Sequence, residues 1–164
     1  MKPVIRIRIA NTSDLPTLED IRQKAFAPVF ESFQNILGDE IYASAQKPED
    51  DGQSEILSSM FSHDSVWQIF VAESSGKVVG FVSMQLNHDS KVGEIGLNAV
   101  HPDYSGNGIG TEMYKFVVHK MKESGMKVAT VATGGDISHA PARRAYEKSG
   151  FNVQIPSVWM CRTL

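Results

Sequence analysis

The sequence of 164 residues contains one cysteine and no long apolar run. Cys161 therefore cannot form a disulfide within the chain, and its apolar neighbours favour a buried side chain over a nucleophile. No run is long enough to span a membrane, and residues 1–9 lack the continuous apolar core of a signal peptide. We therefore expect a cytoplasmic protein without a membrane partner.

The sequence also lacks a strong excess of either charge. A net charge of −3 at pH 7 gives no electrostatic reason to expect binding to nucleic acid. His63, His88, His101 and His119 do not show metal-ligand spacing, so no metal is expected. With 41% hydrophobic residues and neither repeats nor a long linker, residues 1–164 are expected to form a single domain.

Hydrophobic periodicity predicts helices mainly in the first third of the chain and short strands beyond it. A helix is expected over residues 15–33, followed by a second helical region over 39–61 that is interrupted by a loop at 47–52. Further helices are expected at 109–125 and 138–149. Strands are expected at 4–9, 66–73, 77–87, 92–100, 127–133, 151–155 and 158–162.

This order of elements predicts an α/β (α+β) fold. Its centre is a mixed, mostly antiparallel sheet of about seven strands, flanked by about four helices on both faces. In the strand 92–100 the alternation places Ile95, Leu97 and Ala99 on one side of the sheet.

The most informative segment, residues 98–111, joins an apolar strand to a glycine-rich turn and then to an amphipathic helix. Glycines at 106, 108 and 110 allow a tight turn that exposes consecutive N–H groups. The first-turn amides and the dipole of the following helix add to this site. Such a turn is suited to a phosphate or pyrophosphate, so a phosphate-bearing cofactor is expected.

Two common nucleotide motifs do not fit this turn. A Walker-type loop needs Lys followed by Ser or Thr at the helix start, but Gly110 is followed by Thr111 and Glu112. A dinucleotide-binding turn needs Gly-x-Gly-x-x-Gly near the first strand, and here the glycines are evenly spaced and lie two-thirds along the chain. A nucleotide-binding module, which would bind ATP or NAD, remains an alternative.

Residues 94–111 resemble motif A of the GCN5-related N-acetyltransferase (GNAT) family, a strand ending in Ala-Val-x-Pro followed by Gly-x-Gly. Residues 142–151, Ala-Arg-Arg-Ala-Tyr-Glu-Lys-Ser-Gly-Phe, resemble its motif B, Ala-x-x-x-Tyr-x-x-x-Gly-Phe. The two motifs occur in the correct order, and the resemblance covers roughly residues 66–164. It implies a GNAT-like acyl-CoA N-acyltransferase fold with acetyl-CoA as co-substrate.

The resemblance also implies where the cofactor lies. The pantetheine arm would bond to the strand backbone, and the pyrophosphate would rest on the amides of the glycine turn. The expected cofactor-binding residues are Leu97, Asn98, Ala99, Val100, Ser105, Gly106, Asn107, Gly108, Ile109, Gly110, Thr111, His139 and Arg143.

Two of these positions depart from the family pattern. Ser105 stands where the family usually has Arg or Gln, so we expect a weaker or differently shaped contact there. His139 stands where motif B often has Asn, at the end of a cofactor-contacting helix. Arg143, with Arg144 and Lys148, is a candidate for the cofactor's 3′-phosphate, although charged helix positions are more often solvated.

Two residues are candidates for proton transfer. Tyr146 is the candidate general acid, because a phenol can hydrogen-bond to and protonate the departing thiolate. A core role is its alternative, since it lies on the apolar stripe of its helix. Glu94 is the candidate base, acting through water because it lies about 10 Å along the strand from Leu97. Its alternative is a solvated carboxylate on the strand.

The expected reaction is transfer of an acetyl group to a primary amine of a small molecule or peptide, by direct attack in a ternary complex. The acceptor is expected to be bound by the two N-terminal helices and the loops above the sheet, with Phe30, Phe33, Tyr42 and Trp67 as candidate lining residues. The acidic region 39–55 would favour a cationic amine, although such a region is more often only solvated. The alternative function is a catalytically degenerate acyl-CoA-binding or regulatory domain. The resemblance also implies a possible homodimer formed through the C-terminal strands.

Overall fold

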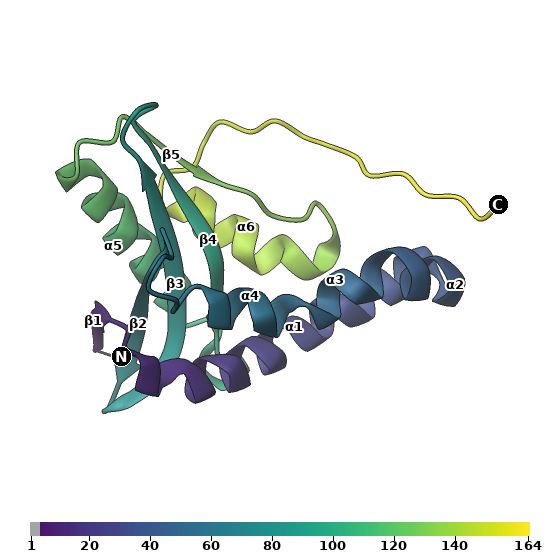
Figure 1. The fold of residues 1–164 in the computed structure, drawn as a ribbon, viewed down its shortest axis with the longest axis horizontal. Coiled ribbons are helices and arrows are strands. Elements are labelled where there is room, and N and C mark those ends of the chain that lie inside the picture. Colours follow the sequence, from purple (N-terminus) through teal and green to yellow (C-terminus); the bar gives the residue numbers. More distant parts are fainter. Residues whose placement is uncertain (1–3) are drawn as a thin grey trace.

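The computed structural model describes residues 4–164, and in this part of the chain five strands form one sheet in the order β1-β2-β3-β4-β5 (Figure 1). β1 to β4 pair in antiparallel fashion and β5 runs parallel to β4. The predicted mixed, mostly antiparallel sheet is confirmed. The strands are β1 (Ile5–Ile9), β2 (Gln68–Ser74), β3 (Lys77–Asn87), β4 (Val92–Val100) and β5 (Val128–Val131).

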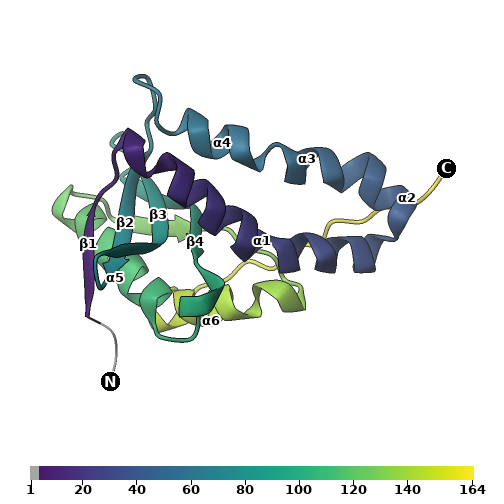
Figure 2. The same ribbon diagram turned by 90° about the horizontal axis from the view of Figure 1, so that it is seen from below.

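Helices cover both faces of this sheet. The chain runs out along α1 and returns along α3 and α4, so that this helical pair projects past the sheet (Figure 2). Across residues 4–164, no helix combines the length and the apolar character that crossing a membrane requires. The helices are α1 (Leu15–Leu37), α2 (Asp39–Ile41), α3 (Lys47–Asp51), α4 (Gln53–Ser59), α5 (Ile109–Glu123) and α6 (Ala140–Lys148).

The prediction of a loop at residues 47–52 is wrong, because α3 occupies this segment. Pro48 lies in the first turn of α3, where the missing N–H costs no hydrogen bond. Glu49 and Asp50 follow it, and their negative charges interact favourably with the positive end of the helix dipole. The proline therefore starts a helix here.

Two apolar clusters hold the helices against the sheet. On one face α5 and α6 pack over β3 and β4, with Met113, Val117 and Tyr146 buried. On the opposite face α1 and α4 cover the sheet, with Leu18 and Leu57 fully buried. The sheet is thus covered on both sides, and α1 contacts the turn that precedes α6.

A bulge in β4 changes the face on which its apolar residues lie. Met84 pairs with Ile95 and Val82 pairs with Asn98, so one extra residue of β4 is accommodated between these two pairs. Ile95 consequently packs in the α5–α6 cluster, whereas Leu97 and Ala99 pack in the α1–α4 cluster. The predicted placement of all three on one side is wrong, because strict alternation does not anticipate a bulge.

The two strands predicted at residues 151–155 and 158–162 are not formed. Residues 152–164 are exposed and extend away from the sheet (Figure 1), which leaves five strands where about seven were expected. The pattern of the tail is typical of a strand, but a strand also needs an edge to pair with. Cys161 is exposed as well, so the predicted burial of its side chain is wrong.

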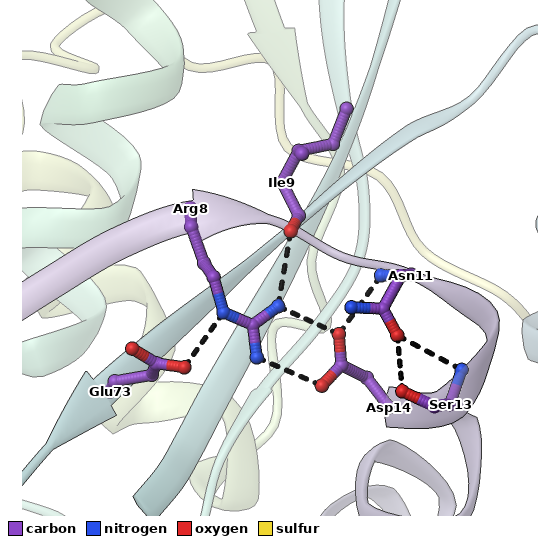
Figure 3. Close-up of polar contacts among 6 residues, drawn as sticks. All are labelled: Arg8, Ile9, Asn11, Ser13, Asp14 and Glu73. Atoms are coloured by element: carbon purple, nitrogen blue, oxygen red, sulfur yellow. Dashed lines mark hydrogen bonds and ion pairs between the residues drawn. The ribbon is translucent and has the colours of Figure 1, made fainter. Parts of the chain in front are cut away.

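Ion pairs connect β1, β2 and the turn before α1 (Figure 3). The guanidinium of Arg8 donates to both carboxylate oxygens of Asp14, at 2.8 and 2.9 Å, and to Glu73 at 2.7 Å. Asp14 also accepts from the backbone N–H of Asn11. The hydrogen bonds from Arg8 hold the pKa of Asp14 below its usual range. This network fixes the start of α1 relative to the sheet.

Replacing Asp14 by Asn is expected to lower the free energy of unfolding at pH 7 by about 2 kcal/mol, because a largely buried carboxylate loses its charge-assisted bonds. Since the folded-state pKa of Asp14 is lowered, its contribution is present above pH 4 and is lost as pH falls further. Urea unfolding of both proteins from pH 7 to pH 3 should show the difference shrinking. A smaller change is expected for Asp51→Asn, whose pair with Lys47 is exposed.

Candidate functional site

The site begins where β4 and β5 part. Their parallel pairing ends at Ile95 and Val131, and the next residues of β4 have no partner on that side in the described register. A cavity of about 710 Å³ occupies this place. It is lined by β4 residues 96–100, by the glycine-rich turn, by residues 132 and 133 after β5, and by parts of α1 and α6.

The bulge of β4 is held open by side chains. Ser83 Oγ donates to the carbonyl oxygen of Leu97 at 2.9 Å, and Asn98 Nδ2 donates to that of Gly96 at 2.9 Å. Gly96 is required here because a Cβ would collide with the ring of Trp67. The backbone edge that faces the cavity is therefore fixed before any ligand binds.

The glycine-rich turn forms the second wall. Gly106 and Gly108 adopt positive φ angles of 79° and 80°, a region that glycine enters without strain. Gly108 is the N-cap of α5 and offers no side-chain cap, so the first-turn N–H groups of this 15-residue helix are not capped by a side chain. This combination of free amides and helix dipole can hold a diphosphate.

Tyr146 brings a phenol to the same cavity from α6. Its Oη accepts a hydrogen bond of 3.0 Å from Asn98 Nδ2. The amide of Asn98 is held in that orientation because its Oδ1 accepts from Tyr114 Oη at 2.7 Å. The hydroxyl proton of Tyr146 is therefore left available for a ligand in the cavity.

Burial raises the pKa of Tyr146, and the hydrogen bond from Asn98 opposes that increase. The phenol therefore carries its proton at neutral pH, as a proton donor must. Tyr114 is also buried, and burial raises its pKa well above the ordinary value. The ring centroids of Tyr114 and Tyr146 are 4.5 Å apart, so each ring restricts the movement of the other.

Most of the residues predicted from the sequence meet at this cavity. Asn107, Glu94 and Arg143 are not among the residues that line it. Asn107 donates to the carbonyl of Tyr104, Glu94 accepts from Gln85, and Arg143 donates to backbone carbonyls. The predicted residues that do line it are Leu97, Asn98, Ala99, Val100, Ser105, Gly106, Gly108, Ile109, Gly110, Thr111, His139 and Tyr146.

Two contributions to the cavity differ from the prediction: Tyr114 was not considered, and α1 lines the cavity through residues other than the expected Phe30 and Phe33. Tyr114 looks like an ordinary apolar position of α5, and only its contact with Asn98 reveals its part. The outer half of α1 supplies an apolar wall of Ala25, Phe26, Pro28 and Val29. Pro28 within a helical pattern was the one local signal, since it marks a position where α1 lacks a backbone hydrogen bond.

The acidic region 39–55 does not reach the cavity. Asp50 is buried and accepts from Tyr42 Oη at 2.9 Å, while Asp51 pairs with Lys47. Burial and then Asp50 raise the pKa of Tyr42 to about 12. None of the described residues that line the cavity carries a carboxylate, whereas Arg144 and Lys148 do line it. Within residues 4–164 no cluster of three potential metal ligands occurs.

A family model now connects this geometry to known proteins. The model of the acetyltransferase (GNAT) family matches residues 30–151, which include the glycine-rich turn, the splayed strands and Tyr146. The chain belongs to the GNAT family. The resemblance drawn from the two motifs is thereby confirmed.

Each of two curated relatives matches one half of this GNAT chain. An uncharacterised N-acetyltransferase of Methanocaldococcus jannaschii is 33% identical over 87 residues, which is 50% of this chain and 38% of the relative. A mycothiol acetyltransferase of Streptomyces coelicolor is 27% identical over 82 residues, 50% of this chain and 26% of the relative. The chain thus spans well under half the length of either relative.

Solved structures share the fold over nearly the whole chain. The PaiA N-acetyltransferase of Thermoplasma acidophilum, in complex with coenzyme A, has a TM-score of 0.70 at 18% identity and covers 94% of this chain and 93% of its own. The ribosomal-protein-S18-alanine N-acetyltransferase of Escherichia coli has a TM-score of 0.67 at 20% identity, with coverages of 93% and 80%. A GNAT acetyltransferase of Brucella melitensis, in complex with acetyl-CoA, has a TM-score of 0.64 at 18% identity, with coverages of 92% and 84%.

Proposed function

We propose that this protein transfers the acetyl group of acetyl-CoA to a primary amine of a small molecule or peptide, by direct attack in a ternary complex. The observation that carries the proposal is the cavity at the β4–β5 splay, where a free strand edge, the glycine-rich turn and a buried phenol meet. Family membership supports the acyl transfer, and neighbours with coenzyme A or acetyl-CoA support the co-substrate.

The cofactor would lie along the cavity walls already described. The pantetheine arm would pair with the free edge of β4 at Leu97, Asn98, Ala99 and Val100, as an added short strand. The diphosphate would rest on residues 105–111 at the start of α5, where the free amides are. The side chains of Asn107 and Arg143 donate to backbone carbonyl oxygens. A contact of Arg143 with the 3′-phosphate would need this side chain to exchange partners, and it stays a prediction.

The chemistry requires one bond to form and one to break. The amine nitrogen attacks the thioester carbon, the new C–N bond forms, and the C–S bond breaks to release the thiolate. An amide N–H of the bulge near Leu97 or Asn98 would stabilise the oxyanion. Tyr146, whose proton is not used by Asn98, would protonate the thiolate sulfur.

The acceptor would reach the thioester along α1. The apolar wall formed by Ala25, Phe26, Pro28 and Val29 suits the carbon frame of an amine or the side chains of a peptide. The S18-alanine N-acetyltransferase, similar in fold, is named for a protein alanine, so peptide α-amines belong in the test alongside small amines.

Calorimetry with coenzyme A, acetyl-CoA, ATP and NAD, followed by thiol release from acetyl-CoA across a panel of amines, tests the proposal. Binding of coenzyme A together with amine-dependent thiol release is expected. Binding without turnover of any amine would instead identify a degenerate acyl-CoA-binding domain. Preference for ATP or NAD would overturn the cofactor assignment.

We also propose that a second copy of the chain covers the exposed tail. Val153, Ile155, Val158 and Met160 are each at least 87% exposed, and they belong to a segment with the pattern of a strand. β5 is the outer strand of the sheet, so its far edge has no partner strand in residues 4–164. A strand from another molecule can pair with such an edge and bury the apolar side chains.

Light scattering coupled to size exclusion is expected to give twice the chain mass of 18.1 kDa for the intact protein. A variant ending at residue 151 is expected to run as a monomer, because the pairing segment is removed. Val158→Asp should weaken the dimer in the same way, since a buried charge has no partner there. Val66→Asp, at another exposed apolar position, should leave it intact. A monomeric intact protein would contradict the proposal.

A further inference from the structure

A polar cluster joins α1 to the start of α6 beside the cavity. Asp136 Oδ1 lies 2.5 Å from His139 Nδ1. Asp136 Oδ2 accepts from Ser32 Oγ of α1 at 2.9 Å and from the backbone N–H of Ser138 at 3.2 Å. Both oxygens of this carboxylate are therefore engaged, and its position is fixed from two elements.

The cluster sets the tautomer of His139. Burial alone would raise the pKa of Asp136, but hydrogen bonds from Ser138, His139 and Ser32 hold it well below its usual range. An ionised carboxylate only accepts hydrogen bonds, so the proton of the neutral imidazole must be on Nδ1. The lone pair of the ring is consequently on Nε2, for which the structure shows no hydrogen bond within residues 4–164.

The surroundings keep the ring in place. Phe33 of α1 stacks on the imidazole, with ring centroids 5.7 Å apart and planes at 29°. On another side Gly134 leaves the space that the pair needs, because a Cβ there would collide with both His139 and Asp136. These contacts on two sides of the imidazole hold its ring in one orientation.

His139 lines the same cavity as Tyr146. His139 is the N-cap of α6 and Tyr146 lies seven positions further along, so the two residues are about two turns apart on the same side of that helix. His139 also contacts α1, the helix that provides the apolar wall of the cavity. The imidazole thus lines the same cavity as the proposed acceptor wall and the proposed general acid.

We propose that His139 is the general base that takes the proton of the acceptor's ammonium group, with Asp136 as its positioning residue. This rests on the proposed acetyl transfer. Nε2 accepts one proton from the ammonium and the ring becomes imidazolium beside the carboxylate of Asp136. The freed lone pair forms the C–N bond as the C–S bond breaks.

The remaining proton transfers involve His139, Tyr146 and water. After the attack the nitrogen loses a second proton, and this proton passes through water to the phenolate that Tyr146 becomes when it protonates the thiolate. Imidazolium releases its proton to water before the next turnover. The net reaction converts an ammonium and a thioester into an amide, a thiol and one proton.

Glu94 is less well placed for this role. Its carboxylate accepts a hydrogen bond from Gln85 and it does not line the cavity. The other charged groups near the imidazole are cationic or engaged: Arg143 donates to the carbonyls of Gly134 and Asp136 at 2.6 and 2.7 Å. Arg144 and Lys148 line the cavity and cannot serve as the base in their charged forms. His139 is therefore the base that the geometry favours.

The test replaces His139 by Asn in the full-length protein. An Asn side chain keeps an N–H donor near the Nδ1 position for Asp136 but has no basic atom. We expect kcat to fall by about 10²-fold or more at pH 7, with coenzyme A affinity changed less than about threefold. The acidic limb that the imidazole sets in the wild-type profile should be lost. The residual rate should instead rise with the fraction of acceptor amine that is already neutral, because only that amine reacts.

Three further variants complete the experiment. Asp136→Asn should shift the acidic limb to lower pH, since the imidazolium loses its neighbouring negative charge. His119→Gln is the matched control, because His119 forms an exposed pair with Glu123 on α5, and it should behave as wild type. Glu94→Gln should keep the acidic limb.

The outcomes separate two failures. If the wild-type protein acetylates an amine and His139→Asn retains that rate and pH profile, the base assignment is overturned and the proposed function stands. If Glu94→Gln removes the acidic limb, the base is Glu94. A wild-type protein that binds coenzyme A but acetylates no amine would overturn both.

Discussion

Replacing Tyr146 by Phe is expected to lower kcat by about 10²- to 10³-fold, while the dissociation constant for acetyl-CoA changes less than about threefold. The substitution removes only the hydroxyl that accepts from Asn98 and faces the cavity. The ring contacts with Tyr114 and Phe151 are preserved, so the packing of α6 should persist. Steady-state thiol release and calorimetry measure the two quantities separately.

Tyr42→Phe is the matched control for this prediction. It removes a hydroxyl that is hydrogen-bonded to Asp50, outside the cavity, so any general effect of losing a hydrogen-bonded phenol hydroxyl would appear there as well. Tyr114→Phe should give an intermediate loss, because the amide of Asn98 would lose the contact that sets its orientation. Equal turnover by wild type and Tyr146→Phe would leave Tyr146 with a packing role only.

Replacing Gly108 by Val is expected to raise the dissociation constant for coenzyme A by about 10- to 100-fold. A β-branched residue at a φ of 80° is strained by about 1–2 kcal/mol, and the turn would relax to relieve it. That relaxation moves the N–H groups at the start of α5, and losing one or two charge-assisted hydrogen bonds gives the stated range. Calorimetry with coenzyme A measures the effect.

Gly76 provides the control for backbone strain. It lies in the β2–β3 hairpin with a φ of 76°, and a Cβ there meets no other atom within 4 Å, as at Gly108. Gly76→Val should therefore lower stability as much as Gly108→Val while leaving coenzyme A affinity unchanged. If both variants bind coenzyme A like wild type, the diphosphate does not rest on this turn.

The sequence predicted the sheet and the glycine-rich turn because local chemistry determines them. Alternation defines the strands, and glycines at 106 and 108 are needed for the positive φ angles of the turn. The bulge of β4 was not predictable, because it depends on Ser83 and Trp67 from distant segments. The contact of Tyr114 with Asn98 was missed for the same reason, since it joins α5 to β4 across the core.

The tail shows the opposite limit. Residues 152–164 have a clear strand pattern, and the strand prediction was wrong because the tail extends away from the sheet and pairs with no strand of residues 4–164. His139 was recognised only as a helix-end residue near the cofactor. Its contact with Asp136 is local, but the contacts that place this pair against Ser32 and Phe33 of α1 join segments more than 100 residues apart in the chain.

The hydrogen bond from Ser32 to Asp136 has a consequence for how new acceptor specificities could evolve. One helix, α1, both forms the apolar wall of the cavity and secures the carboxylate that orients His139. Substitutions that reshape this wall by tilting the helix would also misalign the imidazole. Variation in acceptor choice should therefore come from exchanging side chains at Phe26 or Val29 on an unmoved backbone, with displacement of the helix selected against.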